Sequence, residues 1–305
     1  MTDVTEPSSY RSGFCAFVGR PNAGKSTLTN ALVGSKVVIT SDKPQTTRRA
    51  VRGVLTRPDG QLVIVDTPGL HRPRTLLGQR LNDVVQATLA EVDVVGFCLP
   101  ADQRVGPGDR FIAAQLAELA APLVGIVTKT DLVSRARVAE QLVAVQQLAS
   151  FAEIVPVSAT AGEQVELLAD LLVGRLPEGP QLYPADATTD DDVESRVAEL
   201  IREAALADVR DELPHSIAVT VQEMLPREVP AGRPPLTDVF ATVHLERASQ
   251  KPILLGAGGS WLKRIGTEAR QGIEQLLGRR VYLQLHVSIL GEWQRDPKKL
   301  DRLGF

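Results

Sequence analysis

Short apolar runs alternate with amphipathic stretches through the first half of the chain. Four runs have the length of a buried strand and occupy residues 14–18, 94–99, 123–127 and 154–157. Apolar residues at the spacing of a helix face fill the stretches 109–120 and 135–149 between them. Buried strands that alternate with helices are typical of a mostly parallel sheet with helices on both faces. We therefore expect an α/β fold for this half.

Two further strands are predicted around a tight turn. The apolar segments 51–55 and 61–65 flank Arg57-Pro58-Asp59-Gly60, which is a typical hairpin turn. They bring the predicted sheet to six strands. The polar stretch 35–49 before them is irregular and lies where a mobile loop could reach over a bound ligand. A solvated surface loop explains its composition equally well.

The second half of the chain follows a connection rich in proline. Residues 176–184 hold three prolines and a glycine, which indicates a linker. Asp190, Asp191 and Asp192 precede an amphipathic helix that begins at residue 193, and acidic residues at that position complement the helix dipole. This electrostatic role at the helix N-terminus is favoured over an acidic metal site. Beyond the helix, the pattern predicts two strands, a glycine-rich turn into a basic helix, and a last strand, at residues 216–222, 239–245, 256–270 and 281–287.

This order of elements predicts a smaller α+β domain behind the α/β domain. We expect a flexible tail at residues 1–12 and the α/β domain at residues 13–177. A linker at residues 178–186 then leads to the second domain at residues 187–305.

Composition places the chain among globular proteins of the cytoplasm. It has 305 residues with 43% hydrophobic and 23% charged residues, and its net charge is -3. No apolar run approaches 18 residues, and the N-terminus carries no apolar signal-peptide core. Cys15 and Cys98 both lie in strand-like runs, as expected for reduced core thiols. Because the net charge is negative, any nucleic-acid surface must be local.

A phosphate-binding loop joins the first strand to the first helix. The segment spells G-x-x-x-x-G-K-S between a strand and a helix, which is the context that a phosphate loop requires. Its backbone N–H groups and the helix N-terminus attract an anion, and the lysine adds a full charge. A chance glycine-rich turn is the weaker alternative. The predicted nucleotide-binding residues here are Gly19, Arg20, Pro21, Asn22, Ala23, Gly24, Lys25, Ser26 and Thr27.

Three oxygen-bearing side chains are candidates for a magnesium site. Ser26 offers a hydroxyl from the phosphate loop, and Thr46 or Thr47 could add a second from the polar loop; of these two we select Thr47. Asp66 ends an apolar strand and can orient the hydrated ion through water. It opens the turn Asp66-Thr67-Pro68-Gly69, in which the N–H of Gly69 can point toward a terminal phosphate. We therefore include all four residues of the turn in the nucleotide site.

Two further strand ends predict a guanine-binding site. Asp131 follows Thr128 and Lys129, and its carboxylate can accept hydrogen bonds from N1–H and the exocyclic amine of guanine, a pair that adenine lacks. A small-residue turn ends the last strand and can offer backbone N–H groups to the guanine carbonyl; it comprises Ser158, Ala159 and Thr160. The predicted ligand is therefore GTP or GDP with Mg²⁺.

The C-terminal part contains a candidate RNA-binding motif. A G-x-x-G turn opening a helix is the backbone clamp of a KH domain, and the surrounding order of strands and helices agrees with a type II KH fold. A simple glycine turn capped by the next serine is the alternative. Residues 251–305 hold ten Lys and Arg against five Asp and Glu, so the positive charge is local to this region. The predicted RNA-binding residues are Gly256, Ala257, Gly258, Gly259, Ser260, Lys263, Arg264 and Arg270.

These motifs together resemble the translation-factor-related GTPases and, among them, the bacterial Era family. The resemblance runs from about residue 14 to the C-terminus, through Gly-Arg-Pro-Asn-Ala-Gly-Lys-Ser-Thr-Leu, Pro-Gln-Thr-Thr-Arg and Asp-Thr-Pro-Gly-Leu-His. It implies a GTPase with slow intrinsic turnover in which Lys25, Thr47 and Gly69 act on the phosphates. Leu70 stands where many GTPases have a water-orienting glutamine. Asn22 matches an asparagine that, in related proteins, helps to hold an activating K⁺.

Two departures from the family pattern concern affinity. Thr128 stands where asparagine is more common, and its hydroxyl can make part of the same bracing contacts to the phosphate loop. Ala257 and Gly258 replace the basic residue that the family often carries inside the G-x-x-G clamp.

The resemblance also implies a biological role. The expected partner is the 3′ end of 16S rRNA in the 30S subunit, and the expected role is assembly or maturation of that subunit, with no DNA partner. The expected location is the cytoplasm, with peripheral contact at the inner face of the cell membrane left open. The alternatives are an RNA-binding protein with a vestigial nucleotide site, a related GTPase of tRNA modification or large-subunit assembly, and a small-molecule kinase.

Overall fold

The chain folds into two compact units, each with its own hydrophobic core. The computed structural model describes residues 10–43, 46–70, 73, 75–207, 213–230, 232 and 234–305. The first unit comprises residues 1–38, 47–72 and 81–190, and the second comprises residues 39–46, 73–80 and 191–305. Most of the predicted tail, residues 1–9, lies outside the described residues.

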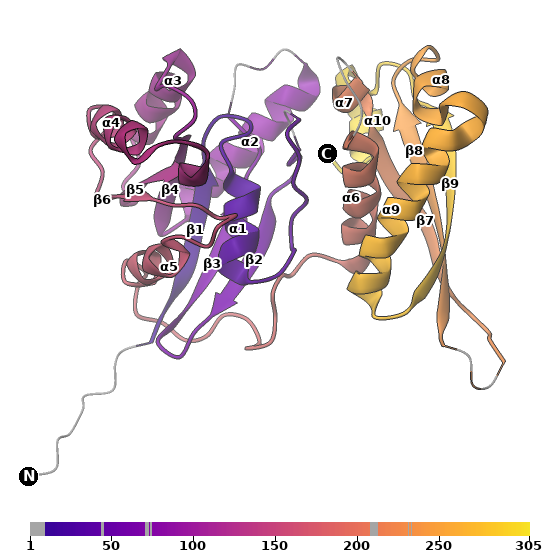
Figure 1. The fold of residues 1–305 in the computed structure, drawn as a ribbon, viewed down its shortest axis with the longest axis horizontal. Helices are drawn as coiled ribbons and strands as arrows, with labels where there is room; N and C mark the ends of the chain where they lie inside the picture. The colour runs from indigo at the N-terminus through magenta and orange to yellow at the C-terminus, as the bar shows by residue number, and fades with distance from the viewer. Residues whose placement is uncertain are drawn as a thin grey trace, which may run out of the picture. The chain divides into compact units, whose positions relative to one another are not determined.

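The first unit is built on a six-stranded sheet in the order β2-β3-β1-β4-β5-β6 (Figure 1). Only β2 runs antiparallel, because it forms the predicted hairpin with β3. The other neighbouring strands are parallel. The strands are β1 (Arg11–Val18), β2 (Val51–Thr56), β3 (Gly60–Asp66), β4 (Val94–Pro100), β5 (Leu123–Thr128) and β6 (Glu153–Pro156). The six-stranded, mostly parallel sheet is therefore confirmed.

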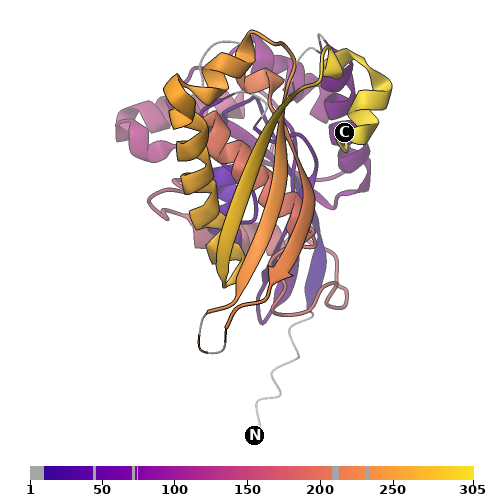
Figure 2. The same ribbon diagram turned by 90° about the vertical axis from the view of Figure 1, so that its right-hand side faces the viewer.

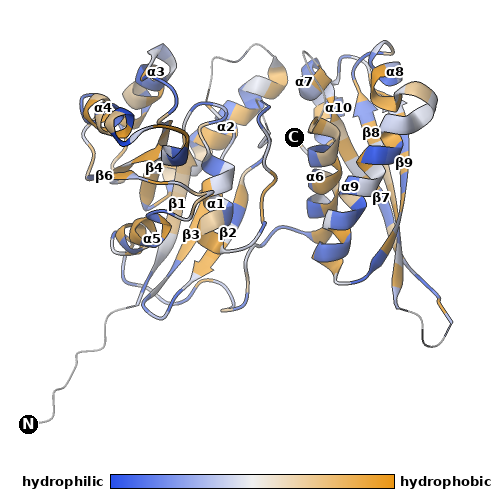
Figure 3. Ribbon diagram, in the orientation of Figure 1, coloured by the Kyte–Doolittle hydropathy of each residue, from blue (hydrophilic) through white to orange (hydrophobic). Residues whose placement is uncertain are grey.

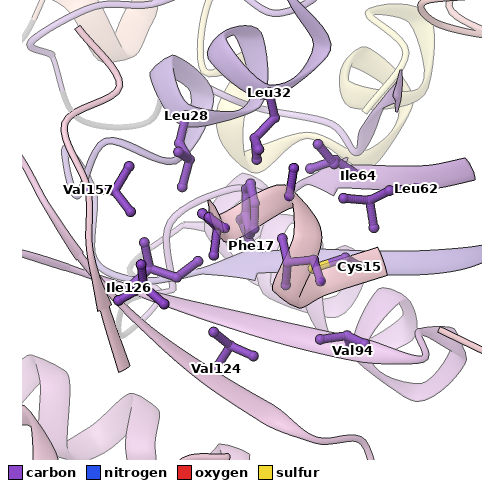
Figure 4. Packing of buried hydrophobic residues seen from close by; sticks show 14 of the residues in the cluster. Cys15, Phe17, Leu28, Leu32, Leu62, Ile64, Val94, Val124, Ile126 and Val157 are labelled. Carbon is purple, nitrogen blue, oxygen red and sulfur yellow. The ribbon is translucent and has the colours of Figure 1, made fainter. Parts of the chain in front are cut away.

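Helices cover both faces of this sheet. On one face, Leu28 of α1 packs with Cys15, Phe17 and neighbouring strand residues (Figure 4). Leu168 of α5 belongs to the same cluster. The opposite face is covered by α2, α3 and α4. In Figure 3 the apolar colour gathers on the strands between these layers. The helices are α1 (Lys25–Val33), α2 (Leu76–Glu91), α3 (Pro107–Leu116), the short η1 (Thr130–Leu132), α4 (Arg135–Gln146) and α5 (Val165–Val173).

The second unit pairs a three-stranded sheet with helices on one face. The strand order is β7-β8-β9, with β7 and β8 antiparallel and β8 and β9 parallel (Figure 2). Apolar residues of α6 and α9 pack against the sheet. The elements are α6 (Val193–Leu206), α7 (Leu213–Ser216), β7 (Ala218–Arg227), β8 (Leu236–Leu245), α8 (Gln250–Leu255), η2 (Ala257–Gly259), α9 (Ser260–Leu277), β9 (Arg280–Ile289), η3 (Trp293–Arg295) and α10 (Pro297–Arg302).

Some boundaries differ from the sequence pattern. The strand predicted at residues 216–222 begins at Ala218 and extends to Arg227 because it pairs with β8 up to that residue, with a register shift between Val221 and Glu223. Asp192 caps α6 by accepting a hydrogen bond from the Ser195 N–H at 2.7 Å, so it lies at the helix N-terminus, where an acidic residue also complements the helix dipole. In the predicted linker, Leu182 and Tyr183 donate their N–H groups to the Gln61 side chain of the first unit. Among the described residues, no helix is long and apolar enough to cross a membrane.

Candidate nucleotide and RNA sites

The phosphate loop lies between the end of β1 and the start of α1. Its backbone turns sharply, with positive φ angles at Gly19, Asn22 and Gly24. A Cβ at Gly19 would lie 2.6 Å from the carbonyl oxygen of Cys98, so a glycine is required there. Such turns direct successive N–H groups into a concave anion-binding loop, and the N-terminus of α1 adds its partial positive charge.

Lys25 lies back over this loop. Its Nζ donates to the carbonyl oxygens of Gly19 and Arg20 at 3.4 and 3.3 Å. Burial lowers the pKa of Lys25, while the nearby Asp66 carboxylate opposes that shift. The ammonium group is thus held at the loop by long hydrogen bonds, from which it can turn toward a phosphate oxygen.

The three predicted magnesium ligands come together beside the loop. Asp66 Oδ2 accepts hydrogen bonds from Ser26 Oγ at 2.7 Å and Thr47 Oγ1 at 3.1 Å, and the two hydroxyl oxygens are 3.0 Å apart. Asp66 Oδ1 is buried without a hydrogen-bond partner among the described residues. Burial raises the pKa of Asp66, and Lys25 and both hydroxyls oppose the shift. Hydroxyl and carboxylate oxygens are ligands that Mg²⁺ prefers, so this cluster fits a magnesium ion.

The turn after β3 is anchored at both sides. Thr67 Oγ1 donates to the Phe17 carbonyl at 2.7 Å, which ties the turn to β1. A Cβ at Gly69 would lie 2.8 Å from the Pro21 nitrogen, so this glycine permits close approach to the phosphate loop. Leu70 is buried in the core on the side of α2, where it cannot orient a water molecule.

Thr128 braces the phosphate loop from the end of β5. Its Oγ1 donates to the Ala23 carbonyl at 2.7 Å, and both residues are buried. The hydroxyl thus makes the bracing contact expected of it in place of an asparagine. It also packs under Gly24, where a Cβ would lie 3.5 Å from the Thr128 side chain.

The predicted guanine-selecting residues also lie together. Asp131 is exposed on η1, and its Oδ1 accepts a hydrogen bond from Ser158 Oγ at 2.7 Å. Ser158 itself is fully buried and accepts from the Ala161 N–H at 3.0 Å, which shapes the turn through Ala159 and Thr160. The second carboxylate oxygen of Asp131 is available to a base.

Asp109 is part of the site although no motif marked it. Its Oδ1 accepts from Arg20 Nε at 2.7 Å, and its Oδ2 accepts from the Gly106 N–H at 2.8 Å. The Asp109 side chain is 1% exposed. It fixes the Arg20 side chain, so Arg20 would serve a phosphate through its backbone. Asp109 lies 89 residues after Arg20, and no spacing rule connects the two positions.

The glycine-rich turn of the second unit joins α8 to α9. Gly256, Gly258 and Gly259 have φ angles of +70°, +58° and +78°, which residues with a side chain rarely adopt. A Cβ at Gly256 would lie 2.9 Å from the Trp261 Cβ. Ser260 makes no cap but is the first residue of α9, so the alternative of a serine-capped turn is wrong.

A basic groove runs beside α9. Its volume is about 730 Å³, and α9 and β9 form much of its wall. Of the predicted RNA-binding residues, Gly259, Lys263 and Arg270 line it. Arg227 and Arg280 also line it, and the sequence pattern did not single them out. Arg264 instead lies 5.7 Å from the Trp261 ring and pairs with Glu268 at 3.8 Å. Trp261 packs against the core.

Two protein-family models match the chain in agreement with this division. The model described as a 50S ribosome-binding GTPase matches residues 14–129. The model described as a KH domain matches residues 212–294.

Curated relatives and solved structures match almost the whole chain. GTPase Era of Streptomyces coelicolor is 63% identical over 302 residues, which cover 97% of this chain and 95% of that protein. A crystal structure of Era in complex with MgGDPNP and nucleotides 1506–1542 of 16S ribosomal RNA is 36% identical with a TM-score of 0.91, over 97% of this chain and 99% of that one. A single-residue variant of Aquifex aeolicus Era bound to GDP.AlF4- is 35% identical with the same TM-score, over 96% and 99%.

Proposed function

This chain belongs to the Era family of GTPases, and on that basis we propose that it hydrolyses GTP to control the binding of 16S rRNA during assembly of the 30S subunit. The observation that carries the proposal is the cluster of Ser26, Thr47 and Asp66 beside the phosphate loop, with Asp66 Oδ1 buried and unpartnered among the described residues. The 16S rRNA fragment bound by the Era homologue supports the choice of partner. Because 30S assembly takes place in the cytoplasm, we place the protein there, and contact with the inner membrane face stays a prediction.

The residues have separate roles at the phosphates. Ser26 and Thr47 would hold Mg²⁺ directly, and Asp66 would orient its water ligands. Mg²⁺ bound there would supply positive charge to the β- and γ-phosphate oxygens. Lys25 turns from the loop carbonyls to the phosphates, and the Gly69 N–H donates to the terminal phosphate. At the other end of the site, Asp131 accepts the two N–H groups that distinguish guanine from adenine.

The buried Leu70 supports a slow intrinsic turnover. A glutamine after the Asp-Thr-Pro-Gly turn would be able to orient the attacking water, whereas the Leu70 side chain packs on the core. Two carboxylates contact the phosphate loop, but Asp66 belongs to the proposed magnesium site and Asp109 accepts from Arg20 Nε, so neither is assigned as a general base. Rate acceleration therefore depends on charge at the phosphates and on an activator.

We propose that K⁺ supplies part of that charge and that Asn22 helps to hold it. Asn22 lies at the turn of the phosphate loop with a φ of 64° and directly follows Pro21, whose nitrogen lies 2.8 Å from the position of a Cβ at Gly69. Replacing Na⁺ by K⁺ at constant ionic strength is expected to raise the rate of phosphate release about tenfold, the effect of roughly 1.4 kcal/mol on the barrier. The variant Asn22→Ala should show equal, low rates in both salts. Equal rates for the unaltered protein would refute the potassium site.

The family model that names the 50S subunit raises large-subunit assembly as a second candidate. That model matches residues 14–129, which lie within the nucleotide-binding part and contain no part of the candidate RNA site. The KH model matches residues 212–294, which include the glycine-rich turn and the groove. A partner should be assigned from the RNA-binding unit, and we therefore favour the small subunit.

Footprinting tests the proposal on both subunits. The full chain is bound to isolated 30S and 50S subunits with Mg²⁺ and either GDP or a non-hydrolysable GTP analogue. We expect protection near the 3′ end of 16S rRNA that is stronger in one nucleotide state. Equal protection in both states would remove the switch, and protection confined to the 50S subunit would establish the second candidate. If neither the unaltered full chain nor Lys25→Ala releases phosphate from GTP, the nucleotide site is vestigial.

A further inference from the structure

A glycine in the middle of α9 has no packing reason to be there. Gly266 lies inside the 18-residue helix, where glycine is less favourable than alanine. A Cβ at this position would contact only Leu285 Cδ1, at an ordinary 3.7 Å. The other interior glycine differs, because a Cβ at Gly272 would lie 3.3 Å from Leu200 of α6. The protein's own packing therefore explains Gly272 and leaves Gly266 unexplained.

The space above Gly266 is the basic groove. Residues one helical turn apart line it, from Gly259 just before α9 through Lys263 and Gly266 to Arg270 on the helix. Leu285 lines it from β9. Gly266 is partly exposed, whereas the core-facing residues of α9 are buried. A glycine at this point leaves helix backbone bare at the middle of the groove.

The charge of the groove identifies the class of its occupant. Four basic side chains line it, and Glu274 is the one acidic residue among its described lining. Glu274 is engaged, since its Oε1 accepts from the Val281 N–H at 3.0 Å. Arg227 is paired with Asp238 at 2.8 Å, whereas Lys263 forms no ion pair with any described residue. The basic side chains of the groove suit the phosphates of a polyanion, and its leucines suit flat apolar groups such as nucleobases. Single-stranded RNA offers both.

We propose that Gly266 is a specificity-determining residue of this groove, where one unpaired nucleobase lies directly on the bare backbone of α9 and against Leu285. The proposal rests on the proposed function, because it specifies how the 16S rRNA strand is held. Lys263 and Arg270, one turn to either side of Gly266, contact the phosphates that flank the base. A methyl group at residue 266 would occupy the position of the base without disturbing the fold.

Gly266→Ala in the full chain tests the proposal through two effects of opposite sign. Alanine stabilises the helix, so the melting temperature of the second unit should rise by about 2–6 °C. Affinity for an RNA of nucleotides 1506–1542 of 16S rRNA should fall about 5- to 100-fold, as expected for overpacking a close contact. Gly272→Ala is the matched control: it should bind the RNA like the unaltered protein and gain no thermal stability.

RNAs with a single abasic position provide the second measurement. At one position of the single-stranded 3′ segment, removal of the base should restore equal affinity to the unaltered protein and Gly266→Ala, because the methyl then meets no base. Three outcomes would each overturn the inference. The RNA affinity of Gly266→Ala could be unchanged, or it could fall together with the melting temperature. Removal of the base could also fail to restore affinity at every position. An unaltered protein that does not bind this RNA would instead refute the proposed function, and the inference with it. An acidic peptide that displaces the RNA from this groove as well as unlabelled RNA does would overturn the assignment of single-stranded RNA as the ligand of the groove.

Discussion

Asp131 is the side chain that we propose selects the base. Ser158 donates to one of its carboxylate oxygens at 2.7 Å and so fixes the orientation of the carboxylate. Hydrogen bonds to a charged group contribute roughly 1.5–3 kcal/mol each. A carboxylate accepts the N–H pair of guanine, whereas an amide at the same place would turn an N–H donor toward the base.

The variant Asp131→Asn should therefore change nucleotide preference. We expect its affinity for GDP to fall about 10- to 150-fold, while xanthosine diphosphate, whose 2-oxo group accepts a hydrogen bond, binds more tightly than GDP. Competition against a fluorescent nucleotide measures both affinities. Asp59→Asn, in the exposed turn between β2 and β3, removes the same charge and should leave both unchanged. A parallel loss for both nucleotides would show that Asp131 serves only the fold.

Thr128 marks the limit of reasoning from single residues. Because Thr128 stands where asparagine is more common, the sequence did not show whether this residue still makes the bracing contact to the phosphate loop. The 2.7 Å hydrogen bond to the Ala23 carbonyl shows that it does, because a threonine hydroxyl reaches the same loop from the end of β5. Asp109, in contrast, had no sequence signal at all, since its partner Arg20 is brought to it only by the folded sheet.

At the scale of elements, the hydrophobic pattern predicted the six strands of the first sheet to within a few residues. Strands such as β3 and β4 are short, buried apolar runs, and such runs are distinct in sequence. In the first unit, the two helices α2 and α5 were not predicted, although their patterns are regular. In α2, Leu77, Leu81, Val85 and Leu89 recur every four residues and are buried. In α5, a similar stripe of buried apolar residues packs on the sheet face that α1 also covers.

The connection between α1 and β2 could not be placed from its sequence. Its residues 39–46 group with the second unit, whereas Thr47 groups with the first and contacts Asp66. Within the second unit, the buried Arg202 of α6 donates to the Thr46 carbonyl and to Glu199. The polar composition that indicated a loop contains no information about this partner, because the contact joins residues 156 positions apart.

At the scale of the whole molecule, charge is divided along the chain. The net charge is -3, yet residues 251–305 carry ten basic and five acidic residues, and residues 185–215 carry three and ten. Four basic residues, Arg227, Lys263, Arg270 and Arg280, line one groove. A negatively charged protein can therefore bind a polyanion, because screening limits each charge to its neighbourhood.

RNA binding should depend on salt in proportion to the groove charges. Lys263, Arg270 and Arg280 line the groove and form no ion pair within the part of the chain that the structure describes. Each phosphate contact to a single strand contributes about -0.7 to the slope of log affinity against log salt, so these three predict a slope of about -2. Affinity for the 16S rRNA fragment would then fall roughly 15-fold between about 50 and 200 mM salt. Fluorescence anisotropy at several salt concentrations measures the slope.

Charge-removing variants separate groove residues from the rest of the surface. Lys263→Gln should reduce the magnitude of the slope by about 0.7, since one phosphate contact is lost. Lys298→Gln removes an equal charge from α10, outside the groove lining, and should leave the slope unchanged. Equal effects of both variants would mean that RNA binds to a diffuse basic surface.

The sequence by itself determined the local features of this protein. Strand and helix patterns, the phosphate loop, the Asp-Thr-Pro-Gly turn and the G-x-x-G turn each depend on residues close together in the chain, so spacing alone reveals them. Only the tertiary structure decided which distant residues meet. Asp109 fixes Arg20, Thr128 braces Ala23, and the space above Gly266 becomes a groove because β9 packs beside α9. Such contacts follow from how the elements pack, and packing depends on the whole hydrophobic core.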